Sequence, residues 1–172
     1  VAGKEEAGKT CLLSAQYIAI ANGRASGFGY RFCHSQSLRG WQKLGEAAFE
    51  WSGSPEEAAV PRTNHSSHRE PSYLHLCFKP RLHGSSRHVE AQTRDLLLTD
   101  MPGEWFDKWS SSADYKNRLP FLKYAHIFWV IVDLPAFLAS RKARADARAL
   151  LARVAEEAGP RPVALLLSKT DK

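Results

Sequence analysis

Four residues near the start of the chain have the types and spacing that suit phosphate binding. Gly3 and Gly8 enclose four residues, and Lys9 and Thr10 follow directly, which satisfies the pattern GxxxxGK[ST] without a mismatch. The glycines let the backbone turn tightly, so that successive N–H groups can approach phosphate oxygens, while the lysine reaches the outer phosphates. The threonine hydroxyl is a ligand for Mg²⁺. The segment therefore predicts a phosphate cradle of the Walker A type.

A second motif begins where an apolar run ends. Residues 95–100 read DLLLTD, and Asp100 to Gly103 then form a DxxG pattern. A carboxylate at Asp100 can hold Mg²⁺ through water, and the backbone amide of Gly103 can contact a terminal phosphate. By itself this pattern is weak, and it gains weight from its position after a strand.

A third motif, SKTD, ends the run 162–171. The carboxylate of Asp171 can accept hydrogen bonds from N1 and the exocyclic amine of guanine. Adenine lacks that pair of donors, so the motif favours a guanine nucleotide over ATP.

The elements that must position these motifs are predicted by apolar patterning. The runs 95–100, 125–133 and 162–171 are continuous and end in polar residues, as strands buried on both faces of a parallel sheet do. A helix is expected directly after the phosphate cradle, up to the helix-stopping pair at 22–23, and a second over 140–158. Alternating strands and helices indicate an α/β fold, with ligands beyond the carboxyl ends of the strands.

Two further segments modify this plan. Residues 72–78 alternate between apolar and other side chains, which predicts a half-buried strand paired antiparallel with 95–100. Residues 24–72 form an elaborated connection, with one helix expected over 37–51. A zinc site could be suggested by four residues of this connection and the strand that follows, His65, His68, His75 and Cys77. The sequence contains no paired CxxC or HxxxH element there, which favours a polar loop instead.

Composition limits the class of protein. The chain has 172 residues, 44% of them hydrophobic and 24% charged, which suits one globular domain over 1–172. No apolar run is long enough to cross a bilayer, and no leader pattern is present. The three cysteines lack CxxC spacing, which predicts reduced thiols and, with the other two observations, a cytoplasmic location. We attribute the net charge of +6 to basic residues on solvated helix faces and in loops, so we do not expect nucleic acid as a partner.

The order of the three motifs resembles the translation-factor-related (TRAFAC) class of P-loop GTPases, and the resemblance covers nearly the whole chain. Within that class, GKEEAGKT, the GFGYRF to LRGW segment and DMPGEWF resemble the domains of bacterial double GTPases found in conflict-system operons. The resemblance implies a three-layer P-loop fold, with a mostly parallel sheet and one antiparallel edge strand. Ser168 departs from the usual Asn or Thr of the third motif, which puts guanine preference in question.

The resemblance also implies the site. Mg²⁺ would be held by Thr10, Thr63 and Asp100, with Thr63 as the switch threonine inside the 24–72 connection, which corresponds to switch I. GTP or GDP would be bound by Gly3, Lys4, Glu5, Glu6, Ala7, Gly8, Lys9, Thr10, Cys11, Gly103, Lys169 and Asp171.

Catalysis is expected from Lys9, Thr63 and Glu104. Glu104 occupies the position where many relatives carry a water-orienting glutamine, although it can equally begin the next helix. Arg62 is a weaker candidate for an arginine finger in cis. Hydrolysis is expected to be slow without a partner.

The leading functional hypothesis is a Mg²⁺-dependent GTP-binding and hydrolysing switch that acts on a protein effector or on further domains of a longer chain. The alternatives are a GTP-binding scaffold that presents residues 104–110 to a partner, and an ATPase of the same fold. Because only two residues precede Gly3 and one follows Asp171, we expect the first strand to be nearly absent and a last strand and helix to be missing.

Overall fold

A computed structural model describes residues 1–37, 41, 72–81 and 92–171 of the protein. The chain divides into two compact units, the first made of Val1–Lys9 and Met101–Lys172, the second of Thr10–Asp100. Apart from Ser37 and Trp41, the helix expected over 37–51 lies outside the described residues, and so do the candidate residues Arg62 and Thr63. No helix among those described is both long and apolar enough to span a bilayer.

The first unit contains a parallel sheet of three strands in the order β1, β5, β6. Strand β1 is the short segment Ala2–Gly3, β5 is Phe128–Asp133 and β6 is Val163–Ser168. Ala2 lies opposite Val130, and Val130 lies opposite Leu165, so the three strands share one register. The parallel strands predicted over 125–133 and 162–171 are therefore confirmed.

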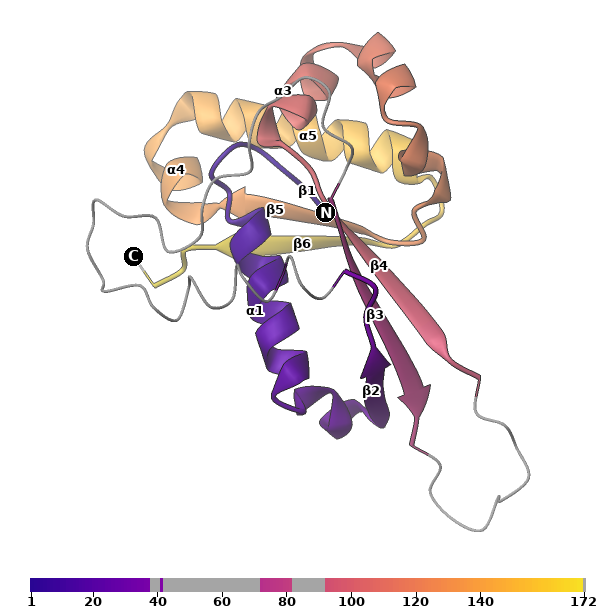
Figure 1. Ribbon diagram of the computed structural model, residues 1–172. Coiled ribbons are helices and arrows are strands. Elements are labelled where there is room, and N and C mark those ends of the chain that lie inside the picture. The colour runs from indigo at the N-terminus through magenta and orange to yellow at the C-terminus, as the bar shows by residue number, and fades with distance from the viewer. Residues whose placement is uncertain (38–40, 42–71, 82–91, 172) are drawn as a thin grey trace. The chain divides into compact units, whose positions relative to one another are not determined.

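Helices cover one face of this sheet. Helix α3 (Gly103–Ser111) and helix α5 (Arg141–Ala158) lie on the same side of it, and α4 (Leu134–Ala139) joins β5 to α5 (Figure 1). Two 3₁₀ helices, η2 (Ala113–Arg118) and η3 (Pro120–Tyr124), connect α3 to β5. Helix α5 begins where the sequence predicts, because the Ser140 side chain accepts a hydrogen bond from the Ala143 N–H and caps the helix.

One apolar core holds the first unit together. It combines alternate residues of β5 with the inner faces of the helices, in the set Ala2, Met101, Phe106, Trp109, Leu119, Leu122, Phe128, Val130, Val132, Ala147, Leu150, Val154 and Ala158. Full burial of one large apolar side chain contributes about 1.5–3 kcal/mol. The packing of α3 and α5 on β5 is therefore the main source of stability in this unit.

Strand β6 differs from its prediction. Continuous apolar strands are expected to be buried on both faces, but Val163, Leu165 and Leu167 are about half exposed. These residues pair with the core residues of β5, so they lie on the helix-covered side of the sheet. Their exposure follows from the position of β6 at the edge of the described sheet, beyond the reach of the side chains that cover β5.

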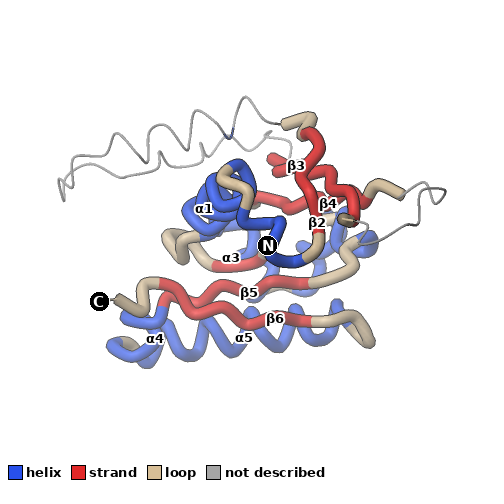
Figure 2. Tube along the Cα trace, turned by 90° about the horizontal axis from the view of Figure 1, so that it is seen from below, coloured by secondary structure: helices blue, strands red, loops and turns tan. Residues whose placement is uncertain are grey.

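The second unit contains an antiparallel sheet (Figure 2). Helix α1 (Lys9–Ala21) starts at the last residue of the first unit and leads through the 3₁₀ helix η1 (Arg24–Phe28) into β2 (Tyr30–His34). Strands β3 (Ser72–Pro80) and β4 (Arg94–Asp100) complete the order β2, β3, β4. The antiparallel pairing of 72–78 with 95–100 is confirmed.

The expectation that 95–100 is buried on both faces is wrong. Within β4, Leu96 and Leu97 are exposed whereas Leu98 is buried. A continuous apolar run was therefore not sufficient evidence for burial on both faces of a sheet.

The predicted alternation of β3 holds on one face only. Leu74 and Leu76 are fully buried as expected, but His75 and Cys77 on the opposite face are buried as well. His75 accepts a hydrogen bond at Nδ1 from the Gln36 N–H and lies 3.2 Å from Asp95 through Nε2. A hydrogen bond from the Cys77 thiol, and then one from His75, holds the pKa of Asp95 below its usual value. Polar partners therefore fill the face that the pattern assigned to solvent.

Candidate functional site

The segment between β1 and α1 forms a tight loop. The Ala7 N–H donates to the Lys4 carbonyl at 3.3 Å, and the backbone has positive φ at Glu6 (60°) and Gly8 (88°). A φ near 88° is strained for any residue with a Cβ, which explains why the second glycine of the motif is needed. The loop thus has the turned backbone that its sequence predicts.

Lys9 closes this loop with its side chain. Its ammonium donates to the carbonyl oxygens of Gly3 at 2.9 Å and of Lys4 at 2.7 Å, and the residue is buried. Helix α1 begins at Lys9, so the positive end of the helix dipole lies beside the loop. Both features place positive charge where the sequence predicts bound phosphate.

Gly103 of the DxxG motif packs directly on the loop. A Cβ at this position would lie 2.2 Å from the Glu5 nitrogen and 2.6 Å from the Lys4 carbonyl carbon. Both neighbours are backbone atoms, so no side chain can be accommodated without moving the loop or helix α3. The structure therefore brings together two motifs that are about a hundred residues apart.

The side chain of Lys4 adds a second connection between the loop and the helices. Its ammonium lies 2.7 Å from Asp146 on α5 and 2.9 Å from Asp107 on α3. Partial burial by itself lowers the pKa of Lys4, but the hydrogen bonds to Asp146 and Asp107 outweigh it and raise the pKa above its ordinary value. Sequence reasoning missed both partners, because nothing in the local pattern links Lys4 to carboxylates more than a hundred positions away.

Thr10 and Asp100 meet within the second unit. The Thr10 hydroxyl donates to the Asp100 carboxylate at 3.0 Å and 3.2 Å, and Asp100 is buried. These residues are the last of the Walker A motif and the first of DxxG, 90 positions apart. The predicted pair of metal-binding oxygens is thus brought together.

The donors of this pair suit Mg²⁺, which prefers hydroxyl, carboxylate and water oxygens. Thr63, the third predicted ligand, lies outside the described residues, and so do His65 and His68. In the part of the chain that the structure describes, no three His, Cys, Asp or Glu side chains gather into a metal site of their own. A metal at Thr10 and Asp100 would therefore need further oxygens from phosphate or water.

The SKTD motif lies at the carboxyl end of β6, next to the end of β5. The Lys169 ammonium lies 2.6 Å from the Asp133 carboxylate, and Lys169 has a positive φ of 56°. Asp133 also accepts a hydrogen bond from the Ala136 N–H, which caps α4. Sequence reasoning missed Asp133, although an Asp followed by Leu-Pro at a strand end is a recognisable helix start.

Ser168, the residue that departs from the usual motif, faces the phosphate loop. Its hydroxyl donates to the Val132 carbonyl at 3.3 Å, and its Cβ lies 3.7 Å from the position that a Cβ on Gly8 would take. Asp171, by contrast, is exposed. The structure therefore places the start of this motif against the loop and leaves the expected base-binding carboxylate accessible.

The residues after DxxG divide between core and surface. Phe106 and Trp109 are buried in the core, and Trp105 packs against it in part. Glu104 lies half-buried in the first turn of α3, where a carboxylate is favourable beside the helix N-terminus. Its catalytic assignment stays a prediction.

The fold and the loop define a P-loop GTPase-related α/β domain, and comparison with known families agrees. The model of the Double-GTPase 2 family matches residues 1–172. The chain belongs to this family. Searches of curated proteins and of solved structures gave no significant match. The resemblance to double GTPases is thereby confirmed, while membership of the TRAFAC class stays a prediction.

Proposed function

We propose that this chain binds GTP together with Mg²⁺, hydrolyses it slowly, and acts as a switch that depends on the nucleotide bound. The observation that carries the proposal is the hydrogen bond between Thr10 and Asp100 at 3.0 Å. A P-loop hydroxyl and a strand-end carboxylate in contact form the oxygen pair that a nucleotide-bound Mg²⁺ requires.

The phosphates would be bound by the loop Gly3 to Thr10 and by the N-terminus of α1. Lys9 would exchange bonds to the loop carbonyls for bonds to the outer phosphates, since both are oxygen acceptors near the same ammonium. The amide of Gly103 lies at the N-terminus of α3 against the loop, where a terminal phosphate would meet it.

A bound Mg²⁺ would neutralise charge on the outer phosphates during phosphoryl transfer. Thr10 and Asp100 would hold it, and Thr63 would join them when the terminal phosphate is present. Loss of this contact with Thr63 after hydrolysis would signal the nucleotide state, as in other switches whose contacts depend on the terminal phosphate.

Three residues complete the proposed chemistry. Glu104 would orient the attacking water, in the position that follows Gly103. Asp171 would accept hydrogen bonds from the guanine base, and Lys169, held by Asp133 at 2.6 Å, would support the base site. Because phosphoryl transfer depends mainly on positioning and charge, this set is sufficient for slow hydrolysis.

Thermal unfolding with Mg²⁺ and GTP, GDP or ATP in turn tests nucleotide binding. A ligand at about 100 times its dissociation constant stabilises the fold by roughly 2.7 kcal/mol, which raises the midpoint by several degrees. We expect guanine nucleotides to raise the midpoint and ATP to leave it unchanged. A shift with ATP alone would instead support the ATPase alternative, and no shift with any nucleotide would contradict the proposal.

The variant Asp171→Asn tests base recognition, because it should change which nucleotide the protein prefers. The variant replaces an acceptor by an amide that can donate, so it should bind GTP more weakly. It should bind xanthosine triphosphate more strongly, because xanthine carries a carbonyl where guanine carries its exocyclic amine. Loss of GTP binding without this gain would point to structural damage, and unchanged GTP binding would remove Asp171 from the site.

Single-turnover hydrolysis separates the switch from the scaffold alternative. We expect measurable conversion of bound GTP to GDP that falls in Glu104→Ala, while the affinity for GTP is retained. Tight binding without any conversion would favour a scaffold that presents residues 104–110.

A further inference from the structure

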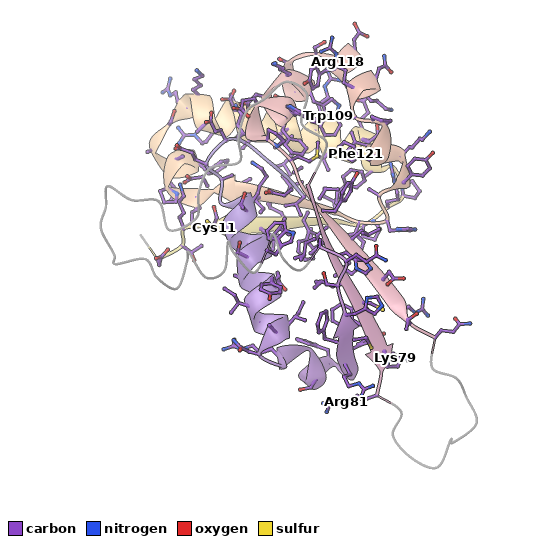
Figure 3. All side chains as sticks on the ribbon, in the orientation of Figure 1. Cys11, Lys79, Arg81, Trp109, Arg118 and Phe121 are labelled. Atoms are coloured by element: carbon purple, nitrogen blue, oxygen red, sulfur yellow. The ribbon has the colours of Figure 1, made fainter. Side chains whose placement is uncertain are left out.

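One end of the second unit's sheet combines exposed positive charge with exposed aromatic rings. We call it the basic-aromatic end, and it consists of Arg24, Phe28, Tyr30, Arg31, Lys79 and Arg94. Strand pairing brings these residues together, since Arg31 lies opposite Lys79 and Phe78 lies opposite Arg94. Figure 3 shows Lys79 and Arg81 at this end.

The charge of this end is not balanced within the described part of the second unit. Asp95 and Asp100 are the only carboxylates there, and they bond to His75 and Thr10 respectively. Arg31 and Lys79 are directly opposite each other on neighbouring strands, an arrangement of like charges that destabilises a sheet. A negatively charged partner would relieve this repulsion.

Phe28 gives this end a protruding apolar group. It ends η1 between Gly27 and Gly29, and 83% of its surface is exposed. No atom lies within 4 Å of the Cβ positions that either flanking glycine would have, so the turn stands clear of its surroundings. The Arg81 N–H donates to the Gly29 carbonyl at 2.7 Å and fixes this turn to the end of β3. A large apolar side chain held out into water gains free energy when a partner buries it.

We propose that the basic-aromatic end binds the surface of an anionic lipid bilayer. Phe28 enters the boundary between headgroups and acyl chains, Tyr30 lies at headgroup level, and the four cations meet lipid phosphates and carboxylates. Long Lys and Arg side chains suit this role because their stems lie along apolar surface while their charges stay in water. The inference goes beyond nucleotide binding and does not depend on it.

The rings argue for a bilayer over nucleic acid. Single-stranded nucleic acid binds by stacking bases on flat aromatic faces along a basic groove. Here the ring of Phe78 is met edge to face by Tyr30 at 6.5 Å and by Phe32 at 6.2 Å, with interplanar angles of 76° and 69°. The rings therefore pack against one another and form no stacking platform, whereas the isolated Phe28 is shaped to insert.

Co-sedimentation of the whole chain with vesicles tests the proposal. We expect binding to vesicles of phosphatidylcholine mixed with phosphatidylserine and much weaker binding to phosphatidylcholine alone. Binding should weaken as salt rises, because a Debye length of about 10 Å at 0.1 M screens charges at the surface. A fluorescent single-stranded RNA is run in parallel, and RNA binding without vesicle binding would overturn the proposal.

Two variants with a matched control locate the surface. Arg31→Ala combined with Lys79→Ala should weaken vesicle binding by roughly fivefold for each cation removed. This variant should fold normally, since it removes a like-charge pair. The control, Lys142→Ala with Arg148→Ala, removes the same charge from the exposed face of α5 and should leave binding nearly unchanged. An equal loss in both variants would mean nonspecific attraction and would refute the assigned surface.

The variant Phe28→Ser separates the contribution of Phe28 insertion to vesicle binding from the contribution of the cations. The side chain touches nothing in the core, so the melting temperature should not change. Vesicle binding should fall severalfold while its dependence on salt is kept, because the cations remain. Unchanged vesicle binding in this variant would overturn the insertion of Phe28 and with it the proposal of a bilayer as partner.

Discussion

The two ends of the candidate nucleotide site in the first unit are held by different means. The phosphate loop is fixed by backbone contacts: Gly103 packs on Glu5, and the Lys9 ammonium binds two loop carbonyls. The SKTD end is held by side-chain contacts, from Lys169 to Asp133 and from Ser168 to the Val132 carbonyl, and its Asp171 is exposed. The phosphate end is therefore pre-organised, whereas the base end can adapt, and substitutions should affect the two ends unequally.

The largest effect is expected from Lys9→Ala. The variant removes charge-assisted hydrogen bonds worth about 1.5–3 kcal/mol each, so the affinity for GTP and GDP should fall tenfold or more. Calorimetric titration measures this, with Lys142→Ala on the exposed face of α5 as the charge-matched control. Equal affinities in the two variants would remove Lys9 from the phosphate site.

The next largest effect is expected from Gly103→Ala, which tests the rigidity of the phosphate end. Its Cβ would overlap the Glu5 backbone, and overpacking of this kind costs about 1–3 kcal/mol of folding free energy. Both the unfolding midpoint and the nucleotide affinity should fall. Gly27→Ala, which has open space around it, is the control and should change neither. A fully stable Gly103→Ala would show that the loop yields easily.

A smaller effect is expected at the base end, from two substitutions of Asp133. Asp133→Ala removes both the cap of α4 and the partner of Lys169, and loss of a cap costs about 1 kcal/mol. Asp133→Asn keeps a capping side chain but loses the charge. We expect only the first to lower the melting temperature clearly, while both weaken GTP binding modestly. If Asp133→Asn retains full affinity, the ion pair with Lys169 is not part of base recognition.

The smallest effect is expected from Lys4→Met, because partly exposed ion pairs contribute about 0.2–1 kcal/mol. The pKa of Lys4 is raised in the folded state, so its contribution is complete below the ordinary value of 10.5 and is lost as pH rises through the raised pKa. Denaturant unfolding at neutral and strongly alkaline pH should show a difference between variant and parent that narrows at high pH. A constant difference would assign the effect to packing.

Much of this organisation could be predicted from the sequence. The tight turn before α1, the helix that begins at Lys9 and the helix capped by Ser140 were predicted correctly, because turns and caps are set by residues that are neighbours in the chain. The direction and exposure of strands were predicted less well. The antiparallel pairing of β4 with β3 was predicted, but apolarity predicted burial on both faces for β4 and β6 and could not show that β6 lies at an edge of the described sheet.

The sequence by itself determined the type and order of the motifs, and with them the family of the chain, since phosphate binding depends on local backbone chemistry. Only the tertiary structure decided which distant groups meet: Gly103 with Glu5, Thr10 with Asp100, and Lys169 with Asp133. The reason is physical. A backbone turn needs only its own residues, whereas a contact between groups many positions apart exists only after sheets and helices have brought them together.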